Sequence, residues 1–151
     1  MRVNPIAGSR AAEILLVEDN EDDVFLTREA FEAASLRVSL HHVDNGEKCM
    51  RFLRKQGEYI NAPSPDLILL DMHMPVMDGY EVMTQIVKDD TLRHLPVVVL
   101  TTSYEAADIQ KMYGLRCSSY ITKPVDFDNF VKAIGQLAGY WLTVVVVPEP
   151  R

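Results

Sequence analysis

Five of the six residues at positions 18–23 are acidic, and they directly follow the apolar run ILLV at residues 14–17. Two carboxylates about 4 Å apart repel each other by roughly 4 kcal/mol where the effective dielectric constant is near 20. Such a cluster therefore either spreads into solvent at the start of a helix, where the helix dipole favours negative charge, or gathers around a cation. Carboxylate oxygens with an open face suit Mg²⁺, which keeps several waters and also binds phosphate groups.

Three further residues could complete phosphate chemistry, and each follows or ends a short apolar run. Asp71 follows LILL, Thr101 ends VVVLT and Lys123 follows SYIT. An aspartate can act as a nucleophile and form an aspartyl phosphate, while a hydroxyl and an ammonium group can bind phosphoryl oxygens. Taken one at a time, these residues are better interpreted as a turn cap before Pro75, a β-branched strand residue and a loop lysine.

The elements that must position these residues alternate along the chain. Strands are predicted at 13–17, 38–43, 66–71, 96–101 and 119–122, and helices near 22–34, 46–55, 79–89, 105–113 and 126–142. Strands that are each followed by a helix indicate βαβ units, and hence a parallel sheet with helices on both faces. We therefore predict an α/β protein with a flavodoxin-like (βα)5 fold, a doubly wound five-stranded parallel sheet of order 2-1-3-4-5.

This strand order brings the candidate residues together. Ligands of open parallel sheets bind beyond the carboxyl ends of the strands, where the strand order reverses. Glu18, Asp19 and Asp71 follow the two strands that would meet there, and Thr101 and Lys123 would lie at the same edge. The convergence of acids, a hydroxyl and an ammonium group predicts a site for Mg²⁺ and a phosphoryl group.

Composition and organisation narrow the class of protein. The chain has 151 residues and a formal charge of −7, which argues against a nucleic-acid surface. We find no apolar run of the roughly 20 residues that a membrane-spanning helix needs, and the two cysteines match no metal spacing. We expect a cytoplasmic protein with a tail at 1–12, one domain at 13–142 and a C-terminal extension at 143–151.

The candidate residues lie in motifs that resemble those of a response-regulator receiver domain, the phosphoacceptor module of two-component signalling. The motifs are VEDN (17–20), LILLDMHMPVMDG (67–79), VVVLTTS (97–103) and YITKP (120–124). They occur in the order typical of that family, and the resemblance covers about residues 12–142. It implies a protein that catalyses only its own phosphorylation and dephosphorylation, and so is not an enzyme acting on other substrates.

The resemblance also implies a role for each site residue. Asp71 would be the phosphoacceptor. Mg²⁺ would be bound by Asp19, Asp71 and the backbone carbonyl of His73, with Glu18 acting through water. Two further residues would bind the phosphoryl oxygens, Lys123 by pairing with them and Thr101 by moving to hydrogen-bond them.

Tyr120 matches the family's aromatic switch, which turns inward when Thr101 moves. The implied reaction is in-line transfer from a phosphohistidine on a sensor histidine kinase. From the residues alone, Tyr120 is better interpreted as an ordinary half-buried strand aromatic.

Looser features favour one subfamily. QGEY, the proline-spaced loop after it, PVVVLTTS and a Trp-Leu pair before valines are similar to segments of the stand-alone response regulators of bacterial phytochromes. This resemblance implies a phytochrome kinase as partner. The run TVVVV (143–147) either folds back on its own domain or pairs strands in a homodimer. The candidate dimer residues are Phe130, Ile134, Trp141, Val144 and Val146.

Other classes of protein fit less well. A haloacid-dehalogenase-type phosphatase would need a second aspartate where His73 stands. A flavodoxin-like FMN carrier would need a phosphate loop where EDNEDD would repel phosphate, and a nucleotide switch would need a G-x-x-x-x-G-K-[ST] motif. A degenerate receiver that only binds partners stays open as the main alternative.

Overall fold

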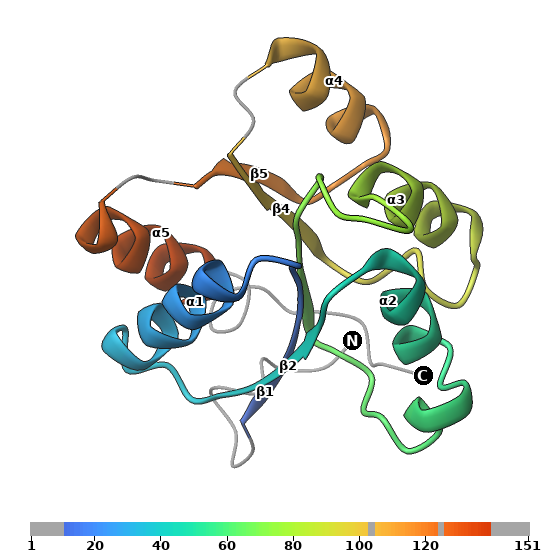
Figure 1. Cartoon of the computed structure of the whole chain (residues 1–151), viewed down its shortest axis with the longest axis horizontal. Coiled ribbons are helices and arrows are strands. Elements are labelled where there is room, and N and C mark those ends of the chain that lie inside the picture. The colour runs from blue at the N-terminus through green and yellow to red at the C-terminus, as the bar shows by residue number, and fades with distance from the viewer. Residues whose placement is uncertain (1–10, 103–104, 124–125, 140–151) are drawn as a thin grey trace.

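Five parallel strands form one sheet in the order β2-β1-β3-β4-β5 in the computed structural model of the chain (Figure 1). The structure describes residues 11–102, 105–123 and 126–139. The strands are β1 (Ala12–Val17), β2 (Val38–Val43), β3 (Leu67–Leu70), β4 (Val97–Thr101) and β5 (Ser119–Thr122). The predicted flavodoxin-like strand order is therefore confirmed, and each strand lies within one residue of its predicted bounds.

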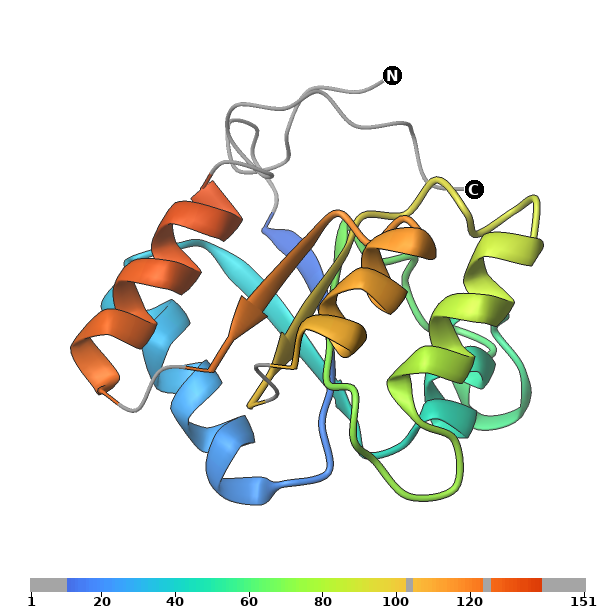
Figure 2. The same cartoon turned by 90° about the horizontal axis from the view of Figure 1, so that it is seen from above.

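The helices cover both faces of the sheet, with α1 and α5 on one face and α2, α3 and α4 on the other (Figures 1 and 2). They are α1 (Glu21–Ala33), α2 (Gly46–Leu53), α3 (Gly79–Lys88), α4 (Ala106–Gly114) and α5 (Phe127–Gly139). A single 3₁₀ turn, η2 (Gly57–Tyr59), interrupts the long connection before β3. The last three residues of the final predicted helix, 140–142, lie outside the described residues. In the described part of the chain, no helix is both long and apolar enough to cross a membrane.

Strand register places the functional residues at one edge. Val17 of β1 pairs with Leu70 of β3, so the residues that follow them, Glu18 and Asp71, leave the sheet side by side. On the far side of β3, Thr101 of β4 pairs with Thr122 of β5. Lys123 therefore leaves β5 at the same edge.

Two apolar layers hold this sheet between the helices. Alternate residues of a strand face opposite sides, and the central strands β1 and β3 are apolar on both. Leu15 and Val17 pack toward α2 and α3, whereas Ile14 and Leu16 pack toward α1 and α5. Every residue of β3 is buried, so the strand that carries Asp71 has its backbone fixed within the core.

Polar side chains cap several of the helices, including α1 and α5, which cover one face of the sheet. The side chain of Asn20 accepts a hydrogen bond from the backbone N–H of Asp23 at 3.1 Å and so caps α1. Before α5, the side chain of Asp126 accepts a hydrogen bond from the backbone N–H of Asp128 at 3.0 Å and so caps that helix. These caps fix the residues at which the two helices begin.

The apolar stripe of α5 packs inside its own domain. Phe130 is 6% exposed and Ile134 is 1% exposed, and both belong to the layer that α1 and β1 share. The expectation that Phe130 and Ile134 contact a second copy is therefore wrong, because these side chains are already covered. The other candidate dimer residues, Trp141, Val144 and Val146, lie outside the described residues.

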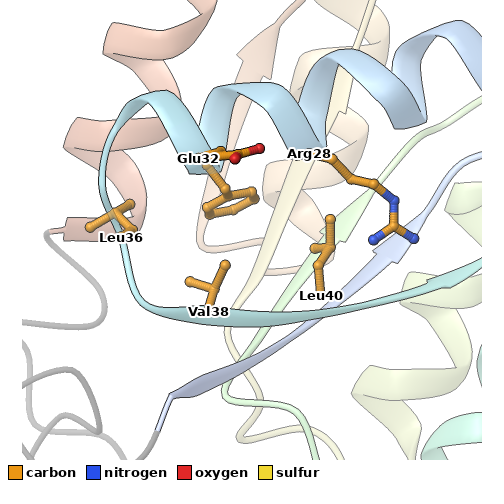
Figure 3. Close-up of a pocket in the computed structure, with 6 residues that line it drawn as sticks. Arg28, Glu32, Leu36, Val38 and Leu40 are labelled. Carbon is orange, nitrogen blue, oxygen red and sulfur yellow. The ribbon is translucent and has the colours of Figure 1, made fainter.

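A shallow groove lies between α1 and the edge strand β2, at the end of the sheet remote from the acidic residues (Figure 3). Its volume is about 390 Å³. It is lined by Arg28, Phe31, Glu32, Leu36, Val38 and Leu40. Arg28 and Glu32 supply charge above a floor that is otherwise apolar, so the groove lacks the cluster of carboxylates and the hydroxyl expected of the predicted site.

Candidate phosphoryl-transfer site

Three carboxylates converge where β1 and β3 end. Glu18, Asp19 and Asp71 each offer an oxygen, and these oxygens all lie within 4.8 Å of one another. Glu18 is 2% exposed and Asp71 is 7% exposed, whereas Asp19 is exposed. Two of the acids are buried and Asp19 is exposed, so the cluster is accessible to solvent at Asp19, which suits a cation that keeps some of its water.

Backbone hydrogen bonds continue the sheet beyond its strands and hold two of these acids. The N–H of Glu18 donates to the carbonyl of Val43 at 3.0 Å, and the N–H of Asp71 donates to the carbonyl of Val17, also at 3.0 Å. The carbonyl of Glu18 lies 2.7 Å from Nε2 of His42, a contact that the sequence did not suggest. The Glu18 and Asp71 backbones are thus fixed by the ladder before any ligand arrives.

Burial changes the acidity of Glu18. Loss of solvent raises its pKa to about 7, and the nearby Asp71 carboxylate adds to the increase. The hydrogen bond from Lys123 acts in the opposite direction and only partly offsets the effect of burial. A divalent cation among the three acids would favour the ionised form of Glu18.

Lys123 approaches the acids from β5. Its N–H donates to the carbonyl of Thr101 at 2.6 Å, which fixes the start of the side chain. Nζ lies 2.5 Å from Oε1 of Glu18, 2.7 Å from Oδ2 of Asp23 and 4.0 Å from Oδ2 of Asp71. Burial acts to lower the pKa of Lys123, but the hydrogen bonds to Asp23 and Glu18, together with the negative charges of Asp71 and Glu18, outweigh it, so the pKa lies above its usual value.

Asp23 is the site residue that the sequence did not identify. Its position in an acidic first turn is explained well enough by the helix dipole. A signal was nevertheless present, because the first turn of α1 begins at the sheet edge where Lys123 was expected. A carboxylate there has a cation within reach.

Thr101 supplies a buried hydroxyl that lacks a partner. The residue is 0% exposed, and its Oγ1 makes no hydrogen bond to any described residue. A buried polar group without a partner costs about 1–3 kcal/mol. At the end of β4, next to the strand that carries Asp71, this hydroxyl suits an oxygen of an incoming phosphoryl group.

The loop after Asp71 is held close to the acceptor by glycine. The N–H of Gly79 donates to the carbonyl of Met72 at 2.9 Å. A Cβ at position 79 would lie 2.4 Å from the backbone oxygen of Asp71, so only glycine fits there. Within the loop, Val76 has a φ of 69°, and His73 is exposed two residues after the acceptor.

Tyr120 lies half-buried on β5 with its hydroxyl directed into the domain. The hydroxyl donates to Sδ of Met72 at 3.5 Å, beside the acceptor loop. Its backbone N–H donates to the hydroxyl oxygen of Tyr113 on α4 at 3.2 Å. Tyr120 thus connects the loop after Asp71 to α4, a position from which a change at the site could reach the surface.

Together these groups can hold a metal ion and a phosphoryl group at one place. The acids supply hard oxygen ligands, and Lys123 and Thr101 supply an ammonium group and a hydroxyl. The arrangement offers no second aspartate two residues after Asp71, since His73 stands there. The residues therefore fit a phosphoacceptor better than they fit a phosphatase of the haloacid-dehalogenase type.

Comparisons with known proteins identify relatives over most of the chain. The response regulator receiver domain family matches residues 14–135. Response regulator Rcp1 of Synechocystis sp. (strain ATCC 27184 / PCC 6803 / Kazusa) is 38% identical over 135 residues, which cover 89% of this chain and 92% of that protein.

Solved structures agree with the sequence comparison. The crystal structure of the phosphorylated cyanobacterial phytochrome response regulator RcpA matches with a TM-score of 0.87 and 39% identity, over 92% of this chain and 99% of that one. The crystal structure of the Mn²⁺-bound form of Rcp1 matches with a TM-score of 0.84 and 38% identity, over 91% and 99% of the two chains.

Proposed function

The chain belongs to the response regulator receiver domain family, and we propose that it accepts a phosphoryl group on Asp71 from a sensor histidine kinase. Its relatives include phytochrome response regulators by both sequence and structure. The observation that best supports the proposal is the buried Thr101 hydroxyl without a partner, beside three acids and a lysine. The chain's own chemistry would be limited to its phosphorylation and dephosphorylation.

In the proposed reaction, a carboxylate oxygen of Asp71 attacks the phosphorus of a phosphohistidine. A P–O bond forms while the P–N bond breaks, and the imidazole nitrogen keeps the electron pair. Lys123 would pair with the phosphoryl oxygens, and Thr101 would donate its hydroxyl to one of them. Positioning and charge stabilisation supply most of the catalysis in such a transfer.

Dephosphorylation would return Asp71 to a free carboxylate, and it breaks the P–O bond that the transfer formed. A water oxygen attacks phosphorus, the P–O bond to Asp71 breaks, and inorganic phosphate leaves as the carboxylate regains its electron pair. His73 is exposed two residues after Asp71 and would affect how easily water approaches.

Mg²⁺ is the proposed cofactor, and it would neutralise charge on the phosphoryl oxygens. Asp19 and Asp71 would bind it directly, together with the backbone carbonyl of His73, and Glu18 would act through water. The residues fit such an ion because their carboxylate oxygens lie within 4.8 Å of one another with an exposed side at Asp19. A solved relative, Rcp1, has a Mn²⁺-bound form.

A phytochrome histidine kinase is the proposed phosphodonor, because RcpA is described as a phytochrome response regulator. The phosphoryl group would add negative charge at Asp71. This charge would shift the equilibrium between two conformations of the loop after Asp71 and of Tyr120, which contacts Met72. A light-dependent rate of transfer from a phytochrome kinase, absent with an unrelated kinase, would support this partner.

Intact mass spectrometry tests the acceptor directly. The protein is incubated with acetyl phosphate, with and without Mg²⁺, as wild type, Asp71→Asn and Asp22→Asn. We expect one phosphoryl adduct that requires Mg²⁺, is absent from Asp71→Asn and is retained in Asp22→Asn, whose exposed acid lies outside the cluster. An adduct on Asp71→Asn would mean that the acceptor is a different residue. No adduct on any variant would favour the degenerate receiver that only binds partners.

A further inference from the structure

The ammonium group of Lys123 has two close carboxylate partners, and only one of them belongs to the acidic cluster. Nζ lies 2.5 Å from Glu18 and 2.7 Å from Asp23. The group of acids that could share a metal ion in the described part of the chain is Glu18, Asp19 and Asp71. Asp23 therefore contacts the lysine while standing outside that group.

Two neighbouring side chains hold the backbone of Asp23 in place. Its N–H donates to Oδ1 of Asn20 at 3.1 Å, and its carbonyl accepts from Oγ1 of Thr27 at 2.7 Å. The side chains of Asp23 and Lys123 are 30% and 10% exposed. The pair is thus partly shielded from water and rigidly mounted, which makes it stronger than an ordinary surface ion pair.

We propose that Asp23 is a positioning residue that restrains Lys123 in its present contacts and competes with the phosphoryl group for its ammonium group. This inference rests on the proposed function. Nζ is 4.0 Å from Asp71 and already pairs with Glu18 and Asp23, so a phosphoryl oxygen on Asp71 competes with these two carboxylates for the ammonium group. A metal ion would draw Glu18 toward itself, and Asp23 would then be the main protein group opposing the move of Lys123.

The competition makes a directional prediction. Asp23→Asn removes the charge that opposes the move of Lys123 toward the phosphoryl group. This change favours the phosphorylated form. We expect roughly three- to tenfold tighter binding of beryllofluoride, a stable substitute for the phosphoryl group, in saturating Mg²⁺.

Three variants separate this role from other effects of charge. Asp22→Asn neutralises a neighbouring acid that is exposed in the same helical turn, and it should change the affinity less than twofold. Asp23→Glu keeps the carboxylate and should stay within about twofold of wild type. A double-mutant cycle with Lys123→Met should abolish the effect of Asp23→Asn, because the effect acts through the lysine.

Fluorine NMR of bound beryllofluoride gives the affinities, and the ¹⁵N signal of the Lys123 ammonium group gives a second measurement. That signal should be sharp in wild type, where Asp23 restrains the ammonium group, and broader in Asp23→Asn. The comparison does not need Lys123→Met, so it tests the proposal even where that variant binds too weakly to complete the cycle. Equal effects of Asp23→Asn and Asp22→Asn, weaker binding by Asp23→Asn, or an unchanged lysine signal would each overturn the proposal. Failure of the proposed function is distinguishable, because wild type would then bind no beryllofluoride at all.

Discussion

Lys123 faces Glu18 across the carboxyl edge of the sheet, with Nζ 2.5 Å from Oε1. The lysine thus contacts a carboxylate that the proposed Mg²⁺ site would also use. Burial nevertheless raises the pKa of Glu18 to about 7, so this contact does not keep the carboxylate fully ionised near neutral pH. Cation binding and proton binding at Glu18 are therefore coupled.

The affinity for Mg²⁺ should consequently depend on pH. Below the Glu18 pKa of about 7, the cation must displace a proton, and affinity should fall by up to tenfold per pH unit. Above pH 8 it should level off. Isothermal titration with MgCl₂ at pH 6, 7 and 8 measures the change. Glu18→Gln should bind more weakly and lose most of this dependence, and a flat wild-type profile would contradict the assignment.

Glu18→Gln should also stabilise the metal-free protein. A carboxyl group whose folded pKa is raised from 4.5 to about 7 favours folding in its protonated form. The loss of stability caused by ionising Glu18 in the folded protein is absent below pH 4.5, grows between pH 4.5 and about 7, and is complete above that pH. The neutral amide should therefore raise the free energy of unfolding by on the order of 1–3 kcal/mol at pH 8, and by much less at pH 5.

Urea denaturation in the presence of a chelator measures this difference at the two pH values. Asp22→Asn is the matched control, because that acid is exposed and lies outside the cluster. A gain for Glu18→Gln that is equal at pH 5 and pH 8 would show that the cause is something other than ionisation of Glu18.

Thr101 offers a test of the buried hydroxyl. Valine has nearly the same shape, so Thr101→Val removes an unpartnered polar group without opening a cavity. We expect the free energy of unfolding of the unphosphorylated protein to rise by about 1–2 kcal/mol. Thr101→Val should bind beryllofluoride more weakly, whereas Asp22→Asn should leave both quantities nearly unchanged. A destabilised Thr101→Val would mean that the hydroxyl already has a partner in solution.

The sequence predicted the residues at the strand ends because two simple rules place them. Apolar runs mark buried parallel strands, and the carboxyl ends of such strands meet at one edge. These two rules alone predict that Glu18, Asp71 and Thr101 lie at the same edge of the sheet. The contact between Asp23 and Lys123 could not be predicted in this way, since it depends on how α1 is rotated against the sheet.

The stripe on α5 shows a second limit of sequence patterns. Phe130 and Ile134 recur at helical spacing, which predicts a covered apolar face. The pattern is the same whether the cover is the chain's own α1 or a second copy of the protein. Only the packing of α5 against α1 distinguishes these cases, and it places both residues in the domain core.

Gly79 and Gly114 form a contrasting pair for the acceptor loop. A Cβ at Gly79 would lie 2.4 Å from the backbone oxygen of Asp71 and 2.8 Å from Cα of Met72, so Gly79→Ala must move the backbone. A Cβ at Gly114 would meet nothing within 4 Å. We expect Gly79→Ala to lower the free energy of unfolding by about 2–4 kcal/mol and Gly114→Ala to change it by less than about 1 kcal/mol.

The same pair tests whether the loop positions the acceptor. Gly79→Ala should lose most of its phosphorylation by acetyl phosphate at a temperature where circular dichroism shows it to be folded, because the shift moves Asp71 relative to Lys123 and Thr101. Gly114→Ala should phosphorylate like wild type. Normal phosphorylation of folded Gly79→Ala would mean that the loop can move away from Asp71 without disturbing it, and that the close contact at Gly79 serves stability alone.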